Sequence, residues 1–206
     1  MDIQSFVKKE LAGDYSGHSY LHGERVASLV KKIVDKEGGN LRICLAAAYL
    51  HDCVDEKLFS DIETQMGRVI DCLKENGYSE KEINETVSII STISFHKEKD
   101  HPLSSHNAMI VSDADKLEAI GAIGIIRTVE YGASKKRPFY DDKNLNLNED
   151  GTFSFKECSE STLSHFYQKL LLLGSHFYTK TGQELAKKRL SFLKEFLDEF
   201  YYELSD

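Results

Sequence analysis

The 206-residue sequence contains only two prolines and has no run of 18 or more apolar residues. Because proline ends helices, its scarcity favours long helical segments. A chain without a long apolar run does not cross a membrane as a helix. The sequence therefore predicts a protein built largely of helices, with no membrane span.

The four cysteines are scattered and form no C-x-x-C pair. The first residues, MDIQSFVKKEL, lack the apolar core of a secretion signal. Both features favour a reducing compartment, and we expect a cytoplasmic protein.

Positive charge is also in deficit, because 26 Lys and Arg face 34 Asp and Glu and leave a net charge of -8. Such a chain repels a phosphate backbone, so non-specific nucleic-acid binding is excluded, and a small anion would need a local basic pocket. The 41% apolar and 29% charged residues are ordinary for a globular protein. A chain of this length buries about 70% of its unfolded surface, and we expect a single domain.

Helical periodicity runs through most of the chain, so the fold class is predicted to be all-α. The helix at 41–53 is apolar nearly all round and should be buried. Two capping boxes are predicted, at Ser79 with Glu82 and at Thr181 with Glu184. The predicted helices cover about 18–37, 41–53, 60–75, 79 onward, 104 or 105 to about 131, 159–178 and 181–203.

Residues 132–158 break this pattern and form an insertion that is too long for a passive connection between helices. Leu145 and Leu147 alternate with Asn, and Phe153 and Phe155 flank Ser154, with NEDG between the two runs. This pattern predicts a small β-hairpin near 143–156. A lid, a dimer contact and a plain surface insertion all remain open for this segment.

The stretch LHDCVDE at 50–56 places a histidine, three carboxylates and a thiol directly after the apolar run CLAAAYL. His51 and Asp52 at the end of a buried helix suit a divalent cation. Imidazole nitrogen with carboxylate oxygen favours Mn, Fe, Co, Ni or Zn over Ca. Two ligands hold a metal weakly, and His22 and Asp115 are the best further candidates by residue type and sequence context. Cys53 is interpreted as a packing residue.

The order H22-x-x-R25-V26, then H51-D52, then A114-D115-K116-L117 resembles the HD-domain metal-dependent phosphohydrolases, an all-α superfamily. The resemblance covers roughly residues 18–131, and 159–204 would add C-terminal helices. IVSDADKLEAIGAIGIIR and HFYQKL are similar to the small stand-alone bacterial and fungal branch, which has nucleotide-hydrolysing members. The resemblance implies four metal ligands, namely His22, His51, Asp52 and Asp115.

Asp113 and Asp115 compete for the last ligand position, because on a helix two such positions point about 200° apart. The A-D-x-L register of the family selects Asp115 and leaves Asp113 a capping or bracing role. Lys116 then falls where deoxynucleotide-hydrolysing relatives keep a phosphate-binding lysine. Arg25 matches the family's H-x-x-R-V pattern and is interpreted as a support for the ligands.

Asp55 lies one turn beyond the His-Asp pair if the helix continues, and Glu56 follows it. Our hypothesis is that one of these carboxylates orients or deprotonates a metal-activated water that attacks phosphorus. Positive side chains must then offset the charge on the phosphoryl oxygens. The candidates are His18, Lys57, Lys116, Arg127 and Lys169.

The resulting prediction is a single-domain phosphohydrolase with one divalent cation, Mn first and Mg, Co, Ni, Fe or Zn as alternatives. Its substrate would be a small phosphorylated metabolite, with nucleoside or deoxynucleoside triphosphates first, and a homodimer remains open. His96, His101 and His106 support a second hypothesis, a dinuclear HD phosphodiesterase or di-iron oxygenase. A third hypothesis is a non-catalytic nucleotide-binding HD module.

Overall fold

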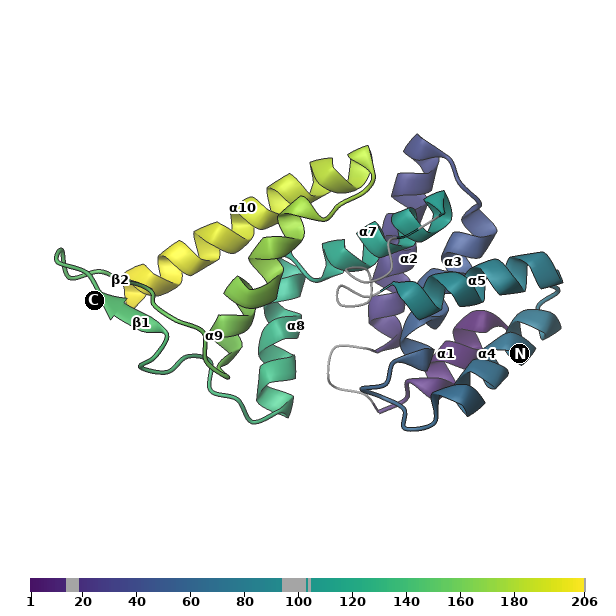
Figure 1. Ribbon diagram of the computed structural model, residues 1–206, viewed down its shortest axis with the longest axis horizontal. Helices are drawn as coiled ribbons and strands as arrows, with labels where there is room; N and C mark the ends of the chain where they lie inside the picture. The colour runs from purple at the N-terminus through teal and green to yellow at the C-terminus, as the bar shows by residue number, and fades with distance from the viewer. Residues whose placement is uncertain (14–18, 94–102, 104, 206) are drawn as a thin grey trace. The chain divides into compact units, whose positions relative to one another are not determined.

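The computed structural model describes residues 1–13, 19–93, 103 and 105–205, which fall into two compact units (Figure 1). The first unit holds the described residues up to Asp115, and the second holds those from Lys116 onward. The expectation of a single domain stays a prediction. The fold class is confirmed as all-α with one small antiparallel sheet. None of the described helices has the length and low charge needed to cross a bilayer.

The first unit is built around helix α3, which is buried on most of its surface. Its buried side chains include Ile43, Ala47 and Leu50, as its apolar composition predicts. Helices α1, α2 and α5 pack against it. The described helices of this unit are α1 (Ile3–Glu10), α2 (Tyr20–Glu37), α3 (Leu41–Leu50), α4 (Ile62–Glu75), α5 (Glu80–Thr92) and the part of α7 (His106–Glu118) up to Asp115.

Local sequence signals account for most ends of these helices. Helix α2 stops at Gly38, whose φ of 76° suits glycine. The capping box of Ser79 and Glu82 is present at the start of α5. Ser105 accepts a hydrogen bond from the N–H of Ala108 at 3.0 Å and so caps α7. Helix α1, capped by Asp2, had not been predicted.

The predicted helix at 41–53 is shorter than expected. Helix α3 ends at Leu50, and His51–Val54 form a tighter 3-10 turn. The ring Nδ1 of His51 donates to the carbonyl of Ala48 at 2.9 Å, which satisfies one carbonyl that the helix end leaves without an intrahelical partner. Because a 3-10 turn has fewer residues per turn than an α-helix, the side chains of the His-Asp pair point in directions that a continued α-helix would not give them.

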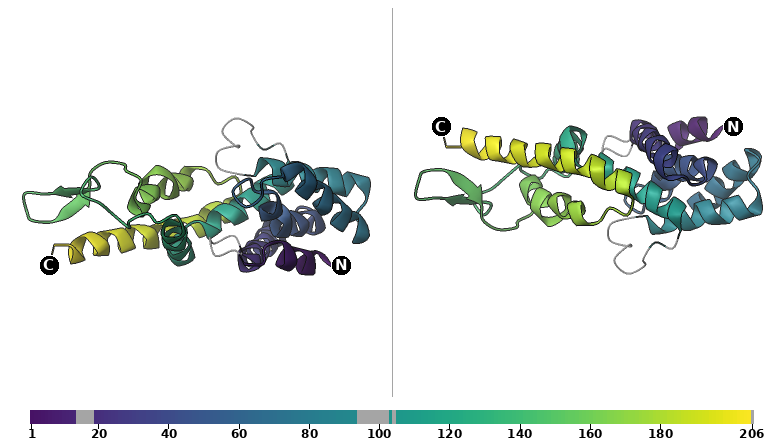
Figure 2. Two further views of the ribbon diagram at one scale, coloured as in Figure 1. Left: turned by 90° about the horizontal axis from the view of Figure 1, so that it is seen from below. Right: turned by 90° about the horizontal axis from the view of Figure 1, so that it is seen from above.

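The second unit contains α8 (Gly121–Ser134), α9 (Thr162–His165) and α10 (Lys180–Glu203). Helix α8 packs against α9 and α10 (Figure 2). The segment after α9 continues as a wide π turn at Phe166–Leu170 and a 3-10 turn at Leu171–Ser175. The predicted helix at 159–178 is therefore three short helical pieces.

The predicted hairpin is present as β1 (Leu145–Leu147) and β2 (Phe153–Phe155), paired antiparallel with Leu145 opposite Phe155. It is tied down by Asn144, which is fully buried and donates to the carbonyl of Glu157 at 2.9 Å and to Ser164 Oγ at 2.8 Å. Phe155 also stacks on Tyr167, with ring centroids 3.7 Å apart.

Two further predicted boundaries are wrong. The helix expected from 104 or 105 to about 131 is two helices, because the chain breaks at Ala119 and Ile120 and Gly121 adopts a φ of 76°. The second capping box is absent, because Thr179 caps α10 by accepting the N–H of Gly182 at 3.0 Å. Thr181 lies inside the helix, so the alternative cap two residues earlier is used.

Candidate metal centre

The four predicted ligands lie on three segments of the first unit. His22 lies in the first turn of α2, and Asp115 lies in the last turn of α7. His51 and Asp52 come from the 3-10 turn that follows the buried helix α3. His22 and His51 are 29 positions apart in the sequence, and His51 and Asp115 are 64 apart, yet their side chains meet in the fold.

The ligand atoms of this cluster lie close together. The two imidazole Nε2 atoms of His22 and His51 are 3.2 Å apart. Asp115 Oδ1 lies 3.2 Å from the Nε2 of His22 and 3.7 Å from that of His51. Asp52 Oδ1 lies 3.3 Å from His51 Nε2, and its Oδ2 lies 3.7 Å from His22 Nε2. Ligand atoms about 2.1 Å from one cation are separated by about 3.0 to 3.4 Å, so these distances suit a shared ion.

Burial makes this cluster costly without a cation. The side chains of His22, His51 and Asp52 are 1%, 8% and 6% exposed. Among the described residues, the buried Oδ2 of Asp52 has no hydrogen-bond partner. A buried carboxylate oxygen without a donor is strongly disfavoured unless a cation compensates it. The residues present therefore fit a divalent metal, and His22, His51 and Asp52 form a group that could hold one.

The hydrogen bond of His51 fixes which of its nitrogens can act as a ligand. A carbonyl only accepts, so Nδ1 must carry the proton that it donates to Ala48 O. The neutral ring then has its lone pair on Nε2, the atom that faces the cluster. A ligating histidine held by a backbone carbonyl through its other nitrogen is the usual arrangement in metal sites.

The acidic pair after the cluster is not where an uninterrupted α-helix would place it. Asp55 follows the 3-10 turn in extended backbone, and its Oδ1 accepts the N–H of Lys57 at 2.8 Å. The α-helical spacing assumed for Asp55 is therefore wrong. Glu56 and Lys57 occupy the exposed turn that comes next. The catalytic roles of Asp55 and Glu56 stay predictions.

The predicted basic contacts of the second unit come from different elements. Lys116 is buried, donates to the carbonyl of His176 at 2.9 Å and lies over the ring of Tyr178. Arg127 on α8 donates to the carbonyl of Glu118 at 3.3 Å. Lys169 lies in the π turn after α9. Their contacts with phosphate stay predictions, and His18 lies outside the described residues.

The remaining predicted side chains can be placed but not given a role. Asp113 is completely buried in α7, and Arg25 is half-buried in α2. His106 must donate from Nε2 to the carbonyl of Glu37, 3.1 Å away. His96 and His101, on which the dinuclear hypothesis depends, lie outside the described residues.

Cys53 is fully buried beside Asp52, in agreement with a packing role. Burial raises the pKa of its thiol, and the nearby charge of Asp52 raises it further. A thiol with a raised pKa is a poor nucleophile and a poor metal ligand at neutral pH.

Arg189 is the residue whose surroundings the sequence concealed. It belongs to the run KKR at 187–189, a charged stretch of a kind that is usually solvated. Lys187 and Lys188 are exposed, but Arg189 is half-buried and its guanidinium contacts Leu117 O and Glu118. Burial lowers the pKa of Arg189, and Glu118 opposes that shift. The helical period of the sequence could have indicated that Arg189 lies on a different face of its helix from Lys187 and Lys188. It could not have identified Leu117 and Glu118 as the residues that Arg189 contacts.

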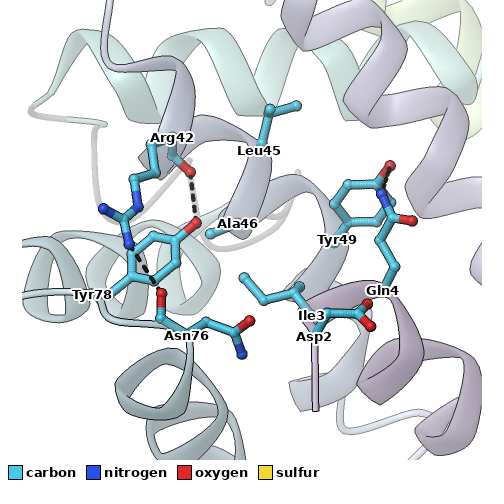
Figure 3. Close-up of a pocket in the computed structure, with 9 residues that line it drawn as sticks. All are labelled: Asp2, Ile3, Gln4, Arg42, Leu45, Ala46, Tyr49, Asn76 and Tyr78. Carbon is cyan, nitrogen blue, oxygen red and sulfur yellow. Dashed lines mark hydrogen bonds between the residues drawn. The ribbon is translucent and has the colours of Figure 1, made fainter.

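An open cleft of about 520 Å³ lies elsewhere in the first unit, between α1, α3 and the turn before α5 (Figure 3). It contains none of the predicted site residues. Its polar side chains largely bond one another, because Arg42 donates to the carbonyl of Asn76, Tyr78 donates to the carbonyl of Arg42, and Gln4 donates to Tyr49. We assign no chemistry to this cleft.

Known proteins similar to this chain include members of a family that is defined by a His-Asp pair. The family model of the HD domain matches residues 20–120. YpgQ of Bacillus subtilis is 33% identical over 198 residues, which cover 95% of this chain and 88% of YpgQ. Protein L803 of Acanthamoeba polyphaga mimivirus is 30% identical over 184 residues, 76% of each chain.

Solved structures give the same result. The crystal structure of Bacillus subtilis YpgQ in complex with ADP has a TM-score of 0.79 at 30% identity, covering 99% of this chain and 98% of that one. An HD-superfamily hydrolase from Bacillus thuringiensis has a TM-score of 0.75 at 33% identity, covering 98% and 94%. With its His-His-Asp group in the matched region, the chain belongs to the HD-domain phosphohydrolase superfamily.

Proposed function

We propose that this protein is a metal-dependent phosphohydrolase that cleaves a phosphoanhydride bond of a nucleotide, with nucleoside or deoxynucleoside triphosphates as first candidates. The observation that carries the proposal is that the two imidazole Nε2 atoms lie 3.2 Å apart, and that Asp52 and Asp115 each place a carboxylate oxygen 3.2 to 3.7 Å from each of them. The relative YpgQ, crystallised with ADP, supports the choice of a nucleotide.

The proposed ligands are His22, His51, Asp52 and Asp115. Two neutral nitrogens and two anionic oxygens suit a borderline divalent cation, and we propose Mn²⁺ first, with Mg²⁺, Co²⁺, Ni²⁺, Fe²⁺ or Zn²⁺ as alternatives. A cation bound there supplies Lewis acidity, which polarises a phosphoryl oxygen and makes a nearby water more acidic. His51 keeps its Nε2 available because Ala48 O holds its other nitrogen.

The proton and charge balance of the reaction falls to residues around the cluster. We propose that Asp55 or Glu56 orients or deprotonates the attacking water, and that the phosphoanhydride oxygen leaves with the departing phosphate. The N–H of Lys57 keeps the carboxylate of Asp55 in place at 2.8 Å. Charge on the phosphoryl oxygens would be offset by His18, Lys57, Lys116, Arg127 and Lys169.

The test is a panel of ribo- and deoxynucleoside triphosphates incubated with Mn²⁺, Mg²⁺, Co²⁺ or Ni²⁺, followed by identification of the phosphate products. We expect turnover with at least one nucleotide and its loss on Asp52→Ala together with the loss of metal binding. Retained turnover in Asp52→Ala would refute the site. Asp71→Ala is the matched control, because that aspartate is 73% exposed and forms an ion pair with the exposed Lys74.

Two other outcomes distinguish the alternatives. Close to two metal equivalents per chain would replace the mononuclear site with a dinuclear one. No turnover, with a nucleotide still raising the melting temperature, would leave a nucleotide-binding module.

A further inference from the structure

The final turn of helix α7 carries the proposed metal ligand Asp115. The two residues at the end of that turn, Leu117 and Glu118, are contacted by arginines of other helices. Arg189 of α10 donates from Nη1 to the carbonyl of Leu117. The same nitrogen lies 3.8 Å from Glu118 Oε1, whose side chain is 3% exposed. Arg127 donates to the carbonyl of Glu118 at 3.3 Å.

These contacts matter because the last carbonyls of a helix have no partner within it. An end whose carbonyls lack partners frays, and cationic side chains there both donate hydrogen bonds and favour the negative end of the helix dipole. The backbone after α7 supplies part of this closure, since the N–H of Ala119 donates to Lys116 O at 3.1 Å and the N–H of Ile120 to Leu117 O at 3.4 Å. Arg189 adds a second and charged donor to Leu117 O. Arg189 therefore acts as a C-terminal cap supplied by another helix.

Asp115 is sensitive to such fraying because it lies three residues before Glu118, within the last turn. Its side chain is 32% exposed, whereas those of the other three ligands are 1% to 8% exposed. The three buried ligands are oriented by the packing around them. Asp115 has less packing and depends more on the direction of its helix.

The fold makes room for this arginine. Gly121 has a φ of 76°, and a Cβ built on it would lie 3.1 Å from the Cβ and Cγ of Arg189. Glycine at 121 thus permits both the sharp break after α7 and the close approach of the arginine stem. The neighbouring Lys188 is exposed.

We propose that Arg189 is a positioning residue for the metal centre, which by holding the last turn of α7 keeps the carboxylate of Asp115 directed at the cation. This inference rests on the proposed function, since it takes Asp115 as a ligand. It makes the state of α10 a determinant of metal affinity.

The test compares Mn²⁺ affinity, measured by electron paramagnetic resonance of the free ion, in the full chain and its variants. Arg189→Met should weaken Mn²⁺ binding about tenfold or more, the usual effect of removing a residue that orients a ligand. Arg189→Lys should recover part of the affinity, and Lys188→Met should match the original protein. In metal-free protein, amide hydrogen exchange of the last turn of α7 should be faster in Arg189→Met than in Lys188→Met.

A double-mutant cycle separates positioning from general damage to the fold. If Arg189 acts through Asp115, Arg189→Met should not weaken Mn²⁺ binding further in an Asp115→Asn background. Equal losses in both backgrounds, or an unchanged affinity in Arg189→Met, would overturn the inference and leave the metal site intact. Absence of Mn²⁺ binding in the original protein would instead overturn the proposed function and, with it, this inference. Arg189→Gln replaces Arg189→Met in the same assays if the methionine variant does not fold.

Discussion

The substitution Asp52→Asn should leave the metal-free protein as stable as the original or more so, and should make it the less stable of the two when metal is added. Without a cation, the protein carries a buried carboxylate whose Oδ2 lacks a hydrogen-bond partner among the described residues. An uncompensated buried oxygen of this kind costs about 1 to 3 kcal/mol. Asparagine has nearly the same shape without the charge, so the unfolding temperature in EDTA should be equal or higher in Asp52→Asn.

Metal should then stabilise only the original protein. At a free Mn²⁺ concentration about 100 times its dissociation constant, binding to the native state adds about 2.7 kcal/mol. For a chain of this size, each kcal/mol moves the melting temperature by about 2 to 4 °C, so we expect a rise of about 5 to 11 °C. Asp52→Asn should show little of this rise.

The assay is thermal unfolding followed by circular dichroism, with and without Mn²⁺, on the original protein, Asp52→Asn and Asp71→Asn. Asp71 is exposed, and the same chemical change there should leave the metal response unchanged. The reasoning would be refuted if Asp52→Asn lost stability in EDTA and kept the full rise with Mn²⁺. That result would mean that Asp52 is a structural partner and not a ligand.

Further predictions concern packing and hydrogen bonds in the second unit and the exposure of the cysteines. Gly132→Ala should destabilise the protein by about 1 to 3 kcal/mol in urea unfolding, because the new Cβ would lie 2.0 Å from Thr162 Oγ1, and an unchanged midpoint would contradict that packing. Asn144→Ala should lower the free energy of unfolding by about 2 to 4 kcal/mol in the same assay, because it leaves Ser161 and other buried partners of the hairpin without their hydrogen bonds. A loss below about 1 kcal/mol would show that the hairpin does not depend on these bonds. In the native protein, a thiol reagent should react rapidly with one cysteine, Cys158, because the other three are buried. After denaturation it should react with all four. Rapid reaction of two or more native thiols would contradict the described burial.

Short-range signals in the sequence identified much of the helical structure. The capping box of Ser79 and Glu82, the glycine stop at Gly38 and the alternating hairpin strands are local, since each depends on residues a few positions apart. Energies that act over such distances can be read from a pattern of neighbours. Where two local solutions compete, as with Thr179 and Thr181 at the start of α10, the pattern does not choose between them.

Two of the wrong boundaries have different causes, one a contact three residues apart and the other a contact between distant residues. The helix at 41–53 tightens after Leu50, where the ring of His51 bonds back to Ala48. The break between α7 and α8 brings Gly121 against Arg189, a contact between residues 68 positions apart. Neither choice is encoded in a local hydrophobic period.

The metal centre, too, was determined partly by the sequence and partly by the tertiary structure. By itself, the sequence determined an acidic, helical chain and supplied the residue types His22, His51-Asp52 and Asp115 in an order that resembles one family. Only the tertiary structure decided that each aspartate places a carboxylate oxygen within 3.7 Å of each imidazole Nε2 atom, and that Arg189 donates to the carbonyl of Leu117. The physical reason is that a ligand's identity is a property of one side chain, whereas its direction depends on helices that pack together from distant parts of the chain.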